Sequence, residues 1–180
     1  IDRLDPIKGI PHKLLAFERM LEDHPEYIGE VVLVQIAVPS RLDVALHQQL
    51  QQRLHLLVGK INGRFGTLGS VPIHYLDTSV NFSELCALYA ASTAMVITSL
   101  RDGMNLVSFE FVACQAKRKG VLLLSEFAGA AQTLGSGALL VNPFNTDEVA
   151  KALYEALHMP EQEREERHQD EGALRAAHAR

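Results

Sequence analysis

Short apolar runs rich in β-branched residues alternate along the chain with longer segments whose apolar residues recur at helical spacing. This pattern predicts five strands, at residues 31–38, 71–76, 94–98, 121–125 and 138–141. It predicts helices at residues 11–22, about 41–61, about 83–91, 106–114 and 146–157. Because strands and helices alternate in this way, the expected fold class is α/β, with a Rossmann-like parallel sheet covered by helices on both faces.

Several residues indicate where the helices begin and end. Pro11 suits the first turn of the first helix, where its missing N–H has no intrahelical role. The helix from about residue 41 is expected to end near Asn62 and Gly63. Asn145 can cap the helix at 146–157, and Glu148 follows three residues later, which is the spacing of a capping box.

Composition restricts the classes of partner. With 180 residues, 47% of them hydrophobic, the chain can bury one sizeable core. The formal net charge of -5 and the lack of a basic tract argue against nucleic-acid binding. No apolar run is long enough to span a membrane, and no signal peptide is visible. Cys86 and Cys114 show no metal-binding spacing and are expected to be buried reduced thiols, which favours the cytoplasm.

The richest polar segment follows the predicted strand at 94–98. Asp102, Gly103 and Asn105 lie between that strand and the helix at 106–114, whose first N–H groups could bind phosphate. Asp102 could accept hydrogen bonds from sugar hydroxyls, although capping the helix is an equally good interpretation. Glu110, expected in the first turn, could reach ribose hydroxyls, or it could simply be a charge favoured near a helix N-terminus.

Cations occupy other presumed strand ends. The chain begins at what would be the end of a strand, so most of that strand is expected to be missing. Arg3 and Lys8 flank the loop that follows, and the two together would suit a diphosphate. Taken alone, a surface ion pair of Arg3 with Asp5, or of Lys8 with some carboxylate, is the better interpretation. Gly9 alone indicates only a positive φ angle.

Other motifs do not favour a metal site or a common catalytic class. Arg41 follows the strand at 31–38 and could serve the ligand or face solvent. The eight histidines form no recognisable ligand cluster, so we predict no metal site. The glycine-rich stretches match neither a P-loop, a GxGxxG fingerprint nor a GxSxG elbow, which leaves NTPase, dehydrogenase and hydrolase functions without support.

Five ordered motifs resemble a known family. They are DRLDPIKG at 2–9, AVPSR at 37–41, GKINGRFG at 59–66, RDGMNLV at 101–107 and SEFAGAA at 125–131. The chain closely resembles the trehalose-6-phosphate synthase family, over residues 1–160, in the C-terminal half that binds the donor. The resemblance implies a lobe of a GT-B glycosyltransferase, a two-lobed metal-independent enzyme that moves glucose from UDP-glucose to glucose 6-phosphate with retention.

The resemblance also implies roles for individual residues. Arg3 and Lys8 would hold the diphosphate and stabilise the leaving nucleotide, with Asp102 as the third catalytic residue, holding the donor glucose. The leaving phosphate would help the acceptor hydroxyl attack from the same face, without a protein nucleophile. Arg41 would reach the acceptor phosphate. The remaining donor-binding residues would be Gly103, Met104, Asn105, Leu106, Val107, Glu110, Ile36 and Val80.

The resemblance leaves the extent of the activity open. Residues 1–160 would form the sugar-nucleotide-binding lobe, and residues 161–180 a charged helix or tail. The N-terminal lobe and an aromatic-rich final helix are absent, so turnover by this segment alone is not expected. That lobe would be one partner, with a homo-oligomer or a trehalose-synthesis complex as candidate assemblies. A synthase-like regulatory domain, alone or fused to a phosphatase, is the alternative. A glycogen or sucrose synthase relative fits less well, because those proteins commonly carry a different acidic motif.

Overall fold

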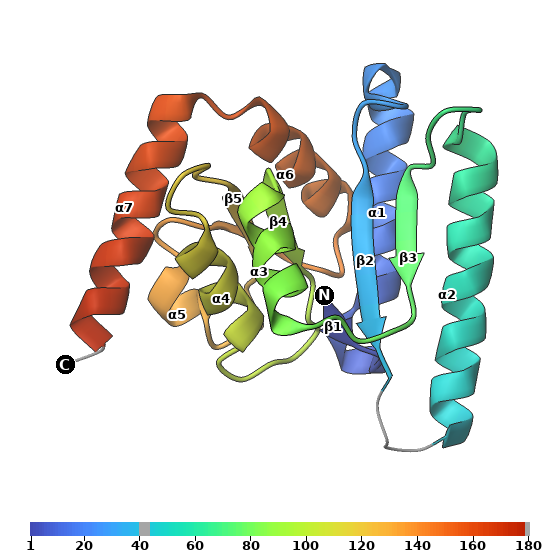
Figure 1. The fold of residues 1–180 in the computed structure, drawn as a ribbon, viewed down its shortest axis with the longest axis horizontal. Coiled ribbons are helices and arrows are strands. Elements are labelled where there is room, and N and C mark those ends of the chain that lie inside the picture. Colours follow the sequence, from blue (N-terminus) through green and yellow to red (C-terminus); the bar gives the residue numbers. More distant parts are fainter. Residues whose placement is uncertain (40–43, 179–180) are drawn as a thin grey trace.

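Strands and helices alternate along almost the whole chain. The computed structural model describes residues 1–39 and 44–178. Its strands are β1 (Asp2–Arg3), β2 (Leu33–Val38), β3 (Ile73–Leu76), β4 (Ala94–Ile97), β5 (Val121–Ser125) and β6 (Leu139–Val141). Its α-helices are α1 (Ile10–Asp23), α2 (Val44–Phe65), α3 (Phe82–Ala91), α4 (Leu106–Cys114), α5 (Ala131–Leu134), α6 (Thr146–His158) and α7 (Glu161–His178). Two 3₁₀ turns, Pro6–Lys8 and Pro25–Tyr27, precede and follow α1 (Figure 1).

All strand pairs are parallel, which confirms the predicted α/β class. The hydrogen bonds define two three-stranded sheets, in the orders β1-β2-β3 and β4-β5-β6, in place of one continuous sheet. The division falls beside β1, which is only two residues long and is paired with β2. Beyond the strand ends, the N–H of Leu100 donates to the carbonyl of Ile7 at 2.7 Å, so a loop contact joins the two halves.

Helices cover both faces of these sheets, and each face has its own core. Figure 1 shows α1 behind β2 and α3 in front of β4. Alternate residues of β5 enter the two cores: Val121 and Leu123 pack in the core with α1, α2 and α6, while Leu122 and Leu124 pack in the core with α3, α4 and α5. A strand buried on both faces reads as a continuous apolar run, which explains why residues 121–125 carry so little alternation.

The predicted end of α2 was wrong. The helix continues through Gly63 to Phe65, which is 8% exposed and packs in the core. The side chain of Asn62 bonds to the neighbouring strand instead. Its amide donates to the carbonyl of Ile73 and its oxygen accepts from the N–H of Ile73, both at 2.9 Å. Because these two bonds tie α2 to β3, Asn62 is a tertiary anchor inside the helix and does not end it.

The caps of two helices show what local spacing can and cannot reveal. Asn145 caps α6 as predicted, since its side chain accepts from the N–H of Glu148 at 3.2 Å. The expected return bond was wrong, because Glu148 accepts from the N–H of Asn142, at 2.9 Å. A complete capping box that we did not predict begins α3, where Asn81 and Glu84 each accept from the other's N–H.

Three further features lie away from the carboxyl ends of the strands. A cavity of about 260 Å³ lies between the amino ends of β2 and β4. The final helix α7 contacts α4 and α5. Cys86 and Cys114 are free thiols, but they are half-buried, so the expectation that they are buried was wrong. Among the described residues no helix is long and apolar enough to cross a membrane.

A buried ion pair holds β1 against α1. The Lys13 ammonium donates to the Asp2 carboxylate at 2.7 Å, with side chains only 4% and 5% exposed, and Gln35 donates to the same oxygen at 3.1 Å. We expect Lys13→Met to lower the free energy of unfolding by about 3–5 kcal/mol, because it leaves a buried carboxylate without its cation. Urea unfolding followed by circular dichroism would measure the loss.

The matched control for this prediction is Lys60→Met. Lys60 pairs with Glu18 at 3.0 Å but is 63% exposed, and Arg64 also contacts Glu18. Removing this exposed partner should lower the free energy of unfolding by less than about 1 kcal/mol. Equal losses in the two variants would contradict the special importance of the Asp2–Lys13 pair.

Candidate anion-binding site at the carboxyl ends of the strands

The site is built where the loop after β1 meets the end of β4. Gly9 has a φ angle of 64°, which confirms the prediction of a positive φ angle. A Cβ atom at this position would lie 2.0 Å from the carbonyl oxygen of Thr98, so only glycine allows the approach. The Thr98 hydroxyl also donates to the carbonyl of Gly9 at 3.0 Å. This close contact fixes the loop that carries Lys8.

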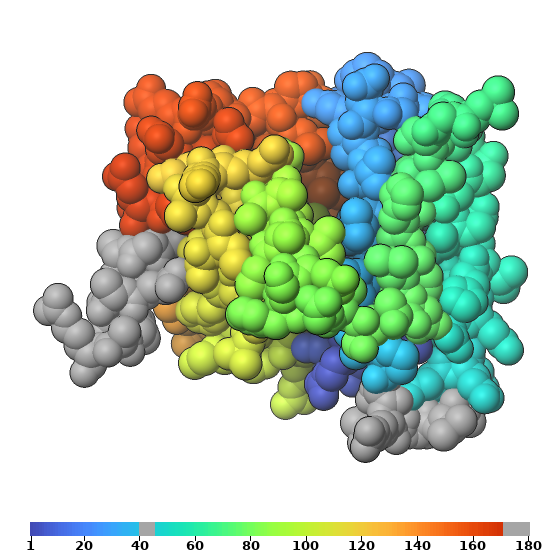
Figure 2. Space-filling model, viewed as in Figure 1, coloured from blue at the N-terminus to red at the C-terminus, as the bar shows by residue number. Residues whose placement is uncertain are grey.

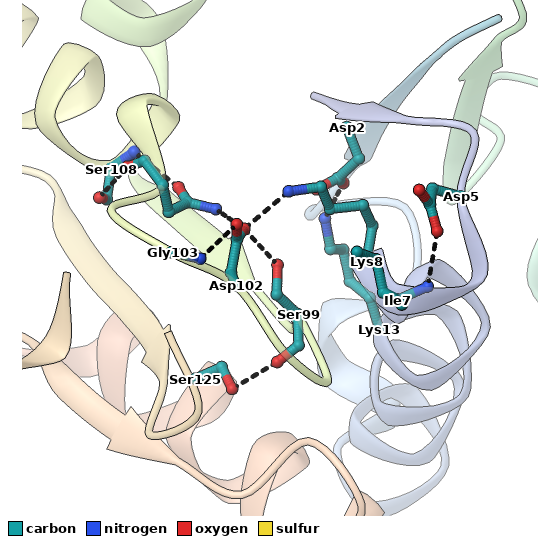
Figure 3. A network of polar contacts seen from close by, with 11 residues as sticks. Asp2, Asp5, Ile7, Lys8, Lys13, Ser99, Asp102, Gly103, Ser108 and Ser125 are labelled. Carbon is teal, nitrogen blue, oxygen red and sulfur yellow. Dashed lines mark hydrogen bonds and ion pairs between the residues drawn. The ribbon is translucent and has the colours of Figure 1, made fainter. Parts of the chain in front are cut away.

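The contact places Lys8 directly beside Asp102. The Lys8 ammonium donates to Oδ2 of Asp102 at 2.7 Å, and the two side chains are 12% and 14% exposed (Figure 3). The alternative of an ordinary surface pair was therefore wrong in one respect: Lys8 does pair with a carboxylate, but the pair is largely shielded from water. Two residues of the predicted set, 94 positions apart, meet at one point.

Asp102 uses its two carboxylate oxygens differently. Oδ2 accepts three hydrogen bonds, from Lys8, from the amide of Asn105 at 2.7 Å and from the hydroxyl of Ser99 at 3.1 Å. Oδ1 accepts one, from the N–H of Gly103 at 2.9 Å. Because a carboxylate oxygen has more than one acceptor direction, Oδ1 can still receive a hydroxyl from a ligand.

Burial alone would raise the pKa of Asp102, but its partners outweigh that effect. Hydrogen bonds from Lys8, Asn105 and Ser99, together with the charge of Lys8, hold the pKa of Asp102 below its ordinary value. Asp102 is therefore ionised at neutral pH and acts only as an acceptor. The stability it gives is present above its unfolded-state pKa and is lost as the pH falls through the lower pKa of the folded state.

Two serines support this network and were missed in the sequence. The hydroxyl of Ser99 bonds Asp102, and the carbonyl of Ser99 accepts from the hydroxyl of Ser125 at 2.6 Å. Both serines are fully buried. Ser99 is the second residue after β4, and Ser125 is the last residue of β5. A hydroxyl at the carboxyl end of an apolar strand was the available signal, since parallel strands end at the same edge of the sheet.

The helix start beside Asp102 has free N–H donors. The cap of α4 is Asn105, whose oxygen accepts from the N–H of Ser108 at 3.1 Å, so the alternative role of Asp102 as the cap was wrong. Among the described residues, the N–H groups of Met104, Leu106 and Val107 have no acceptor. Such groups, at the positive end of a helix dipole, are suited to a phosphate.

The other predicted cation positions differ in what the structure can say of them. Arg3 is exposed, and no described residue forms an ion pair or hydrogen bond with it. The alternative pair with Asp5 was wrong, because the Asp5 carboxylate accepts from the N–H of Ile7 at 3.0 Å. Arg3 is thus available to an anion. Arg41 lies outside the described residues.

Three further predicted residues lie around the cluster. Glu110 is the fifth residue of α4, just beyond the first turn where we expected it, and its carboxylate accepts from the hydroxyl of Tyr89 at 3.1 Å. Ile36 is buried near the end of β2. Val80 is half-buried in the loop that leads from β3 to α3. In the described part of the chain, no three His, Cys, Asp or Glu residues are grouped so as to hold a metal ion.

The parallel α/β fold, the free N–H groups of α4 and the Lys8–Asp102 pair define a Rossmann-like domain with a candidate anion-binding site at its strand ends. The chain matches the model of glycosyltransferase family 20 over residues 1–174, and it belongs to that family.

Similar proteins carry more specific names. The chain is 62% identical over 168 residues to a probable alpha,alpha-trehalose-phosphate synthase [UDP-forming] of Arabidopsis thaliana, covering 93% of this chain and 20% of that protein. It is 62% identical over 164 residues to the alpha,alpha-trehalose-phosphate synthase [UDP-forming] of Pichia angusta, covering 91% of this chain and 34% of that protein.

A solved structure of a similar protein has the same fold. The Burkholderia xenovorans alpha,alpha-trehalose-phosphate synthase (UDP-forming), in complex with glucose-6-phosphate, superposes with a TM-score of 0.92 at 44% identity, covering 96% of this chain and 38% of that one. The predicted resemblance and the C-terminal GT-B lobe are confirmed. The chain spans between about a fifth and two fifths of the length of these three proteins.

The Lys8–Asp102 pair gives a direct electrostatic test. We expect Lys8→Met to raise the pKa of Asp102, because the variant removes a hydrogen bond and a positive charge from the ionised form. Carboxyl carbon NMR, followed as a function of pH, would measure the change. Lys117→Met, an exposed lysine beyond the far end of α4, should leave the pKa of Asp102 unchanged. An unaltered pKa in Lys8→Met would contradict the ion pair.

Proposed function

We propose that this chain is the donor-binding lobe of a UDP-forming trehalose-phosphate synthase. The whole enzyme would transfer glucose from UDP-glucose to glucose 6-phosphate with retention, giving trehalose 6-phosphate and UDP. Residues 1–160 form the sugar-nucleotide-binding lobe, and residues 161–180 form its charged C-terminal extension. The observation that carries the proposal is the shielded Lys8–Asp102 pair next to the free N–H groups of α4. It supports a site for an anionic sugar ligand in a chain of family 20.

The diphosphate lies against the cationic loop and the start of α4. Lys8 supplies a compact charge and Arg3 a fork of donors, while Leu106 and Val107 donate their backbone N–H groups. These groups stabilise the negative charge that grows on the diphosphate as the bond to glucose breaks. Because the protein supplies this positive charge itself, the transfer needs no metal ion or other cofactor.

The donor glucose lies against Asp102 and the backbone that follows it. Oδ2 of Asp102 is fully engaged by Lys8, Ser99 and Asn105, so the oxygen that receives a sugar hydroxyl is Oδ1. Gly103, Met104 and Asn105 approach the sugar through their backbone. The lowered pKa of Asp102 makes it a weak base and a weak nucleophile, so it positions the sugar. The leaving phosphate then assists the acceptor hydroxyl on the same face.

The remaining predicted residues contact other parts of the donor and the acceptor. Glu110 binds the ribose hydroxyls, and Ile36 and Val80 border the base. Arg41 reaches the phosphate of the acceptor, glucose 6-phosphate. The partner that supplies the rest of the acceptor site is an N-terminal lobe of the same enzyme, and the reaction takes place in the cytoplasm.

Nucleotide binding tests the proposal. Calorimetric titration of the chain with UDP and with UDP-glucose should show binding. The Arg3→Ala, Lys8→Ala double variant should weaken it about 100-fold or more, since two charge-assisted contacts are lost. The control, Lys117→Ala with Arg118→Ala, removes the same charge from an exposed turn and should bind as the parent does. Equal weakening in both double variants would reduce the effect to net charge and contradict the site.

Transfer can be tested separately. Replacing the matching segment of the Pichia angusta synthase with this chain would supply the missing length. We expect the chimaera to form trehalose 6-phosphate, measured by chromatography of the products, and Asp102→Asn in the chimaera to reduce kcat/KM at least about tenfold. A folded chimaera that binds UDP-glucose but makes no product would reject the synthase function and favour a regulatory role.

A further inference from the structure

Tyr89 is a buried phenol that touches the edge of the proposed donor site. It lies on α3 and is 3% exposed, and its ring meets the ring of Phe111 on α4 edge to face, with centroids 6.4 Å apart. Its hydroxyl donates to Oε2 of Glu110 at 3.1 Å. Packing therefore fixes the ring, and the ring fixes the position of its hydroxyl. Figure 2 shows that the α3 segment covers the middle of one face of the molecule.

Glu110, in contrast, is exposed and has one oxygen left over. Among the described residues its only hydrogen-bond or ion-pair partner is Tyr89, which engages Oε2 and leaves Oε1 open. Glu110 follows Leu106 by four positions and Val107 by three, so it lies one turn below the free N–H groups on the same side of α4. In a ligand whose phosphates lie at the start of α4, the next polar groups would lie about one helical turn farther along α4, close to Glu110.

The proton of the Tyr89–Glu110 contact stays on the tyrosine. Burial raises the pKa of Tyr89, and the nearby Glu110 carboxylate raises it further. The phenol is therefore a permanent donor at neutral pH, and Glu110 is left as an acceptor. The open Oε1 can receive hydroxyl groups and cannot serve a second anion.

We propose that Tyr89 is a positioning residue for recognition of the nucleotide ribose: it anchors one oxygen of Glu110 so that the other is held ready for a ribose hydroxyl. The inference rests on the proposed function, which places the ribose at Glu110. An exposed glutamate otherwise samples several rotamers, and ordering it on binding costs affinity. The buried phenol removes part of that cost before the ligand arrives.

The test uses one substitution and two ligands. We expect Tyr89→Phe, which keeps the ring and removes only the hydroxyl, to weaken UDP binding by about fivefold in calorimetric titration of the chain. The same substitution should leave the affinity for 2′,3′-dideoxyuridine diphosphate unchanged, because that ligand offers Glu110 no hydroxyl. A general structural role of Tyr89 would weaken both ligands alike.

Two control variants sharpen the result. Tyr75→Phe removes a phenol hydroxyl that has no partner among the described residues, on β3, and should leave both affinities unchanged. In a Glu110→Ala background, Tyr89→Phe should have no further effect on UDP, because the positioned group is gone. This second comparison keeps the test informative even if Tyr89→Phe lowers stability slightly.

The outcomes separate the two proposals. If the parent chain binds UDP, and Tyr89→Phe reduces the affinity for UDP but not for 2′,3′-dideoxyuridine diphosphate, the positioning role is supported. If the parent chain binds UDP, and Tyr89→Phe changes neither affinity or lowers both equally, the positioning role is overturned and the donor site stands. If the parent chain binds neither UDP nor UDP-glucose, the donor site is overturned, and the positioning role with it.

Discussion

The close approach of Gly9 to the end of β4 is the constraint on which the site depends. No residue with a Cβ atom fits there, since that atom would lie 2.0 Å from the carbonyl oxygen of Thr98. The two flanking hydrogen bonds, from Leu100 to Ile7 and from Thr98 to Gly9, lock the loop of the first sheet onto the second. Lys8 is the residue just before this contact. It therefore reaches Asp102 as a consequence of the packing, and a cation and a carboxylate from loops of different sheets form one ion pair.

In this ion pair, the protein holds one oxygen of the Asp102 carboxylate, and the other oxygen can accept a hydrogen bond from a ligand. Three donors hold Oδ2 of Asp102, so its orientation is fixed before any ligand arrives. The same donors lower its pKa and keep it ionised, which leaves Oδ1 as a constant acceptor. Glu110 is arranged in a similar way: the Tyr89 hydroxyl donates to Oε2, and Oε1 is open. Preorganisation of this kind reduces the conformational entropy that side chains lose when a ligand binds.

Much of the fold, and some of the residues that meet at the candidate site, were predictable from the chain. Alternate residues of β5 supply two cores because an apolar run that is long enough only for a strand must be buried on both sides. Asp102 and Lys8 could be named as candidates because polar residues that follow buried strands gather at one edge of a parallel sheet. From the residues alone, however, a surface ion pair was the better interpretation of Lys8, and a helix cap was an equally good interpretation of Asp102. The roles of Asn62 and Asn105 were not predictable, since the same residue types cap helices, end them or join two elements according to what lies opposite.

The sequence by itself determined the α/β class, the positions of most elements and the family, because periodicity and ordered motifs are local properties of a chain. The tertiary structure decided which groups meet: Lys8 with Asp102, Ser125 with Ser99, and Tyr89 with Glu110. It also decided which carboxylate oxygen is engaged and which is open. These contacts join residues that are between 21 and 94 positions apart, and their geometry follows from how loops and helices pack, which no local pattern records.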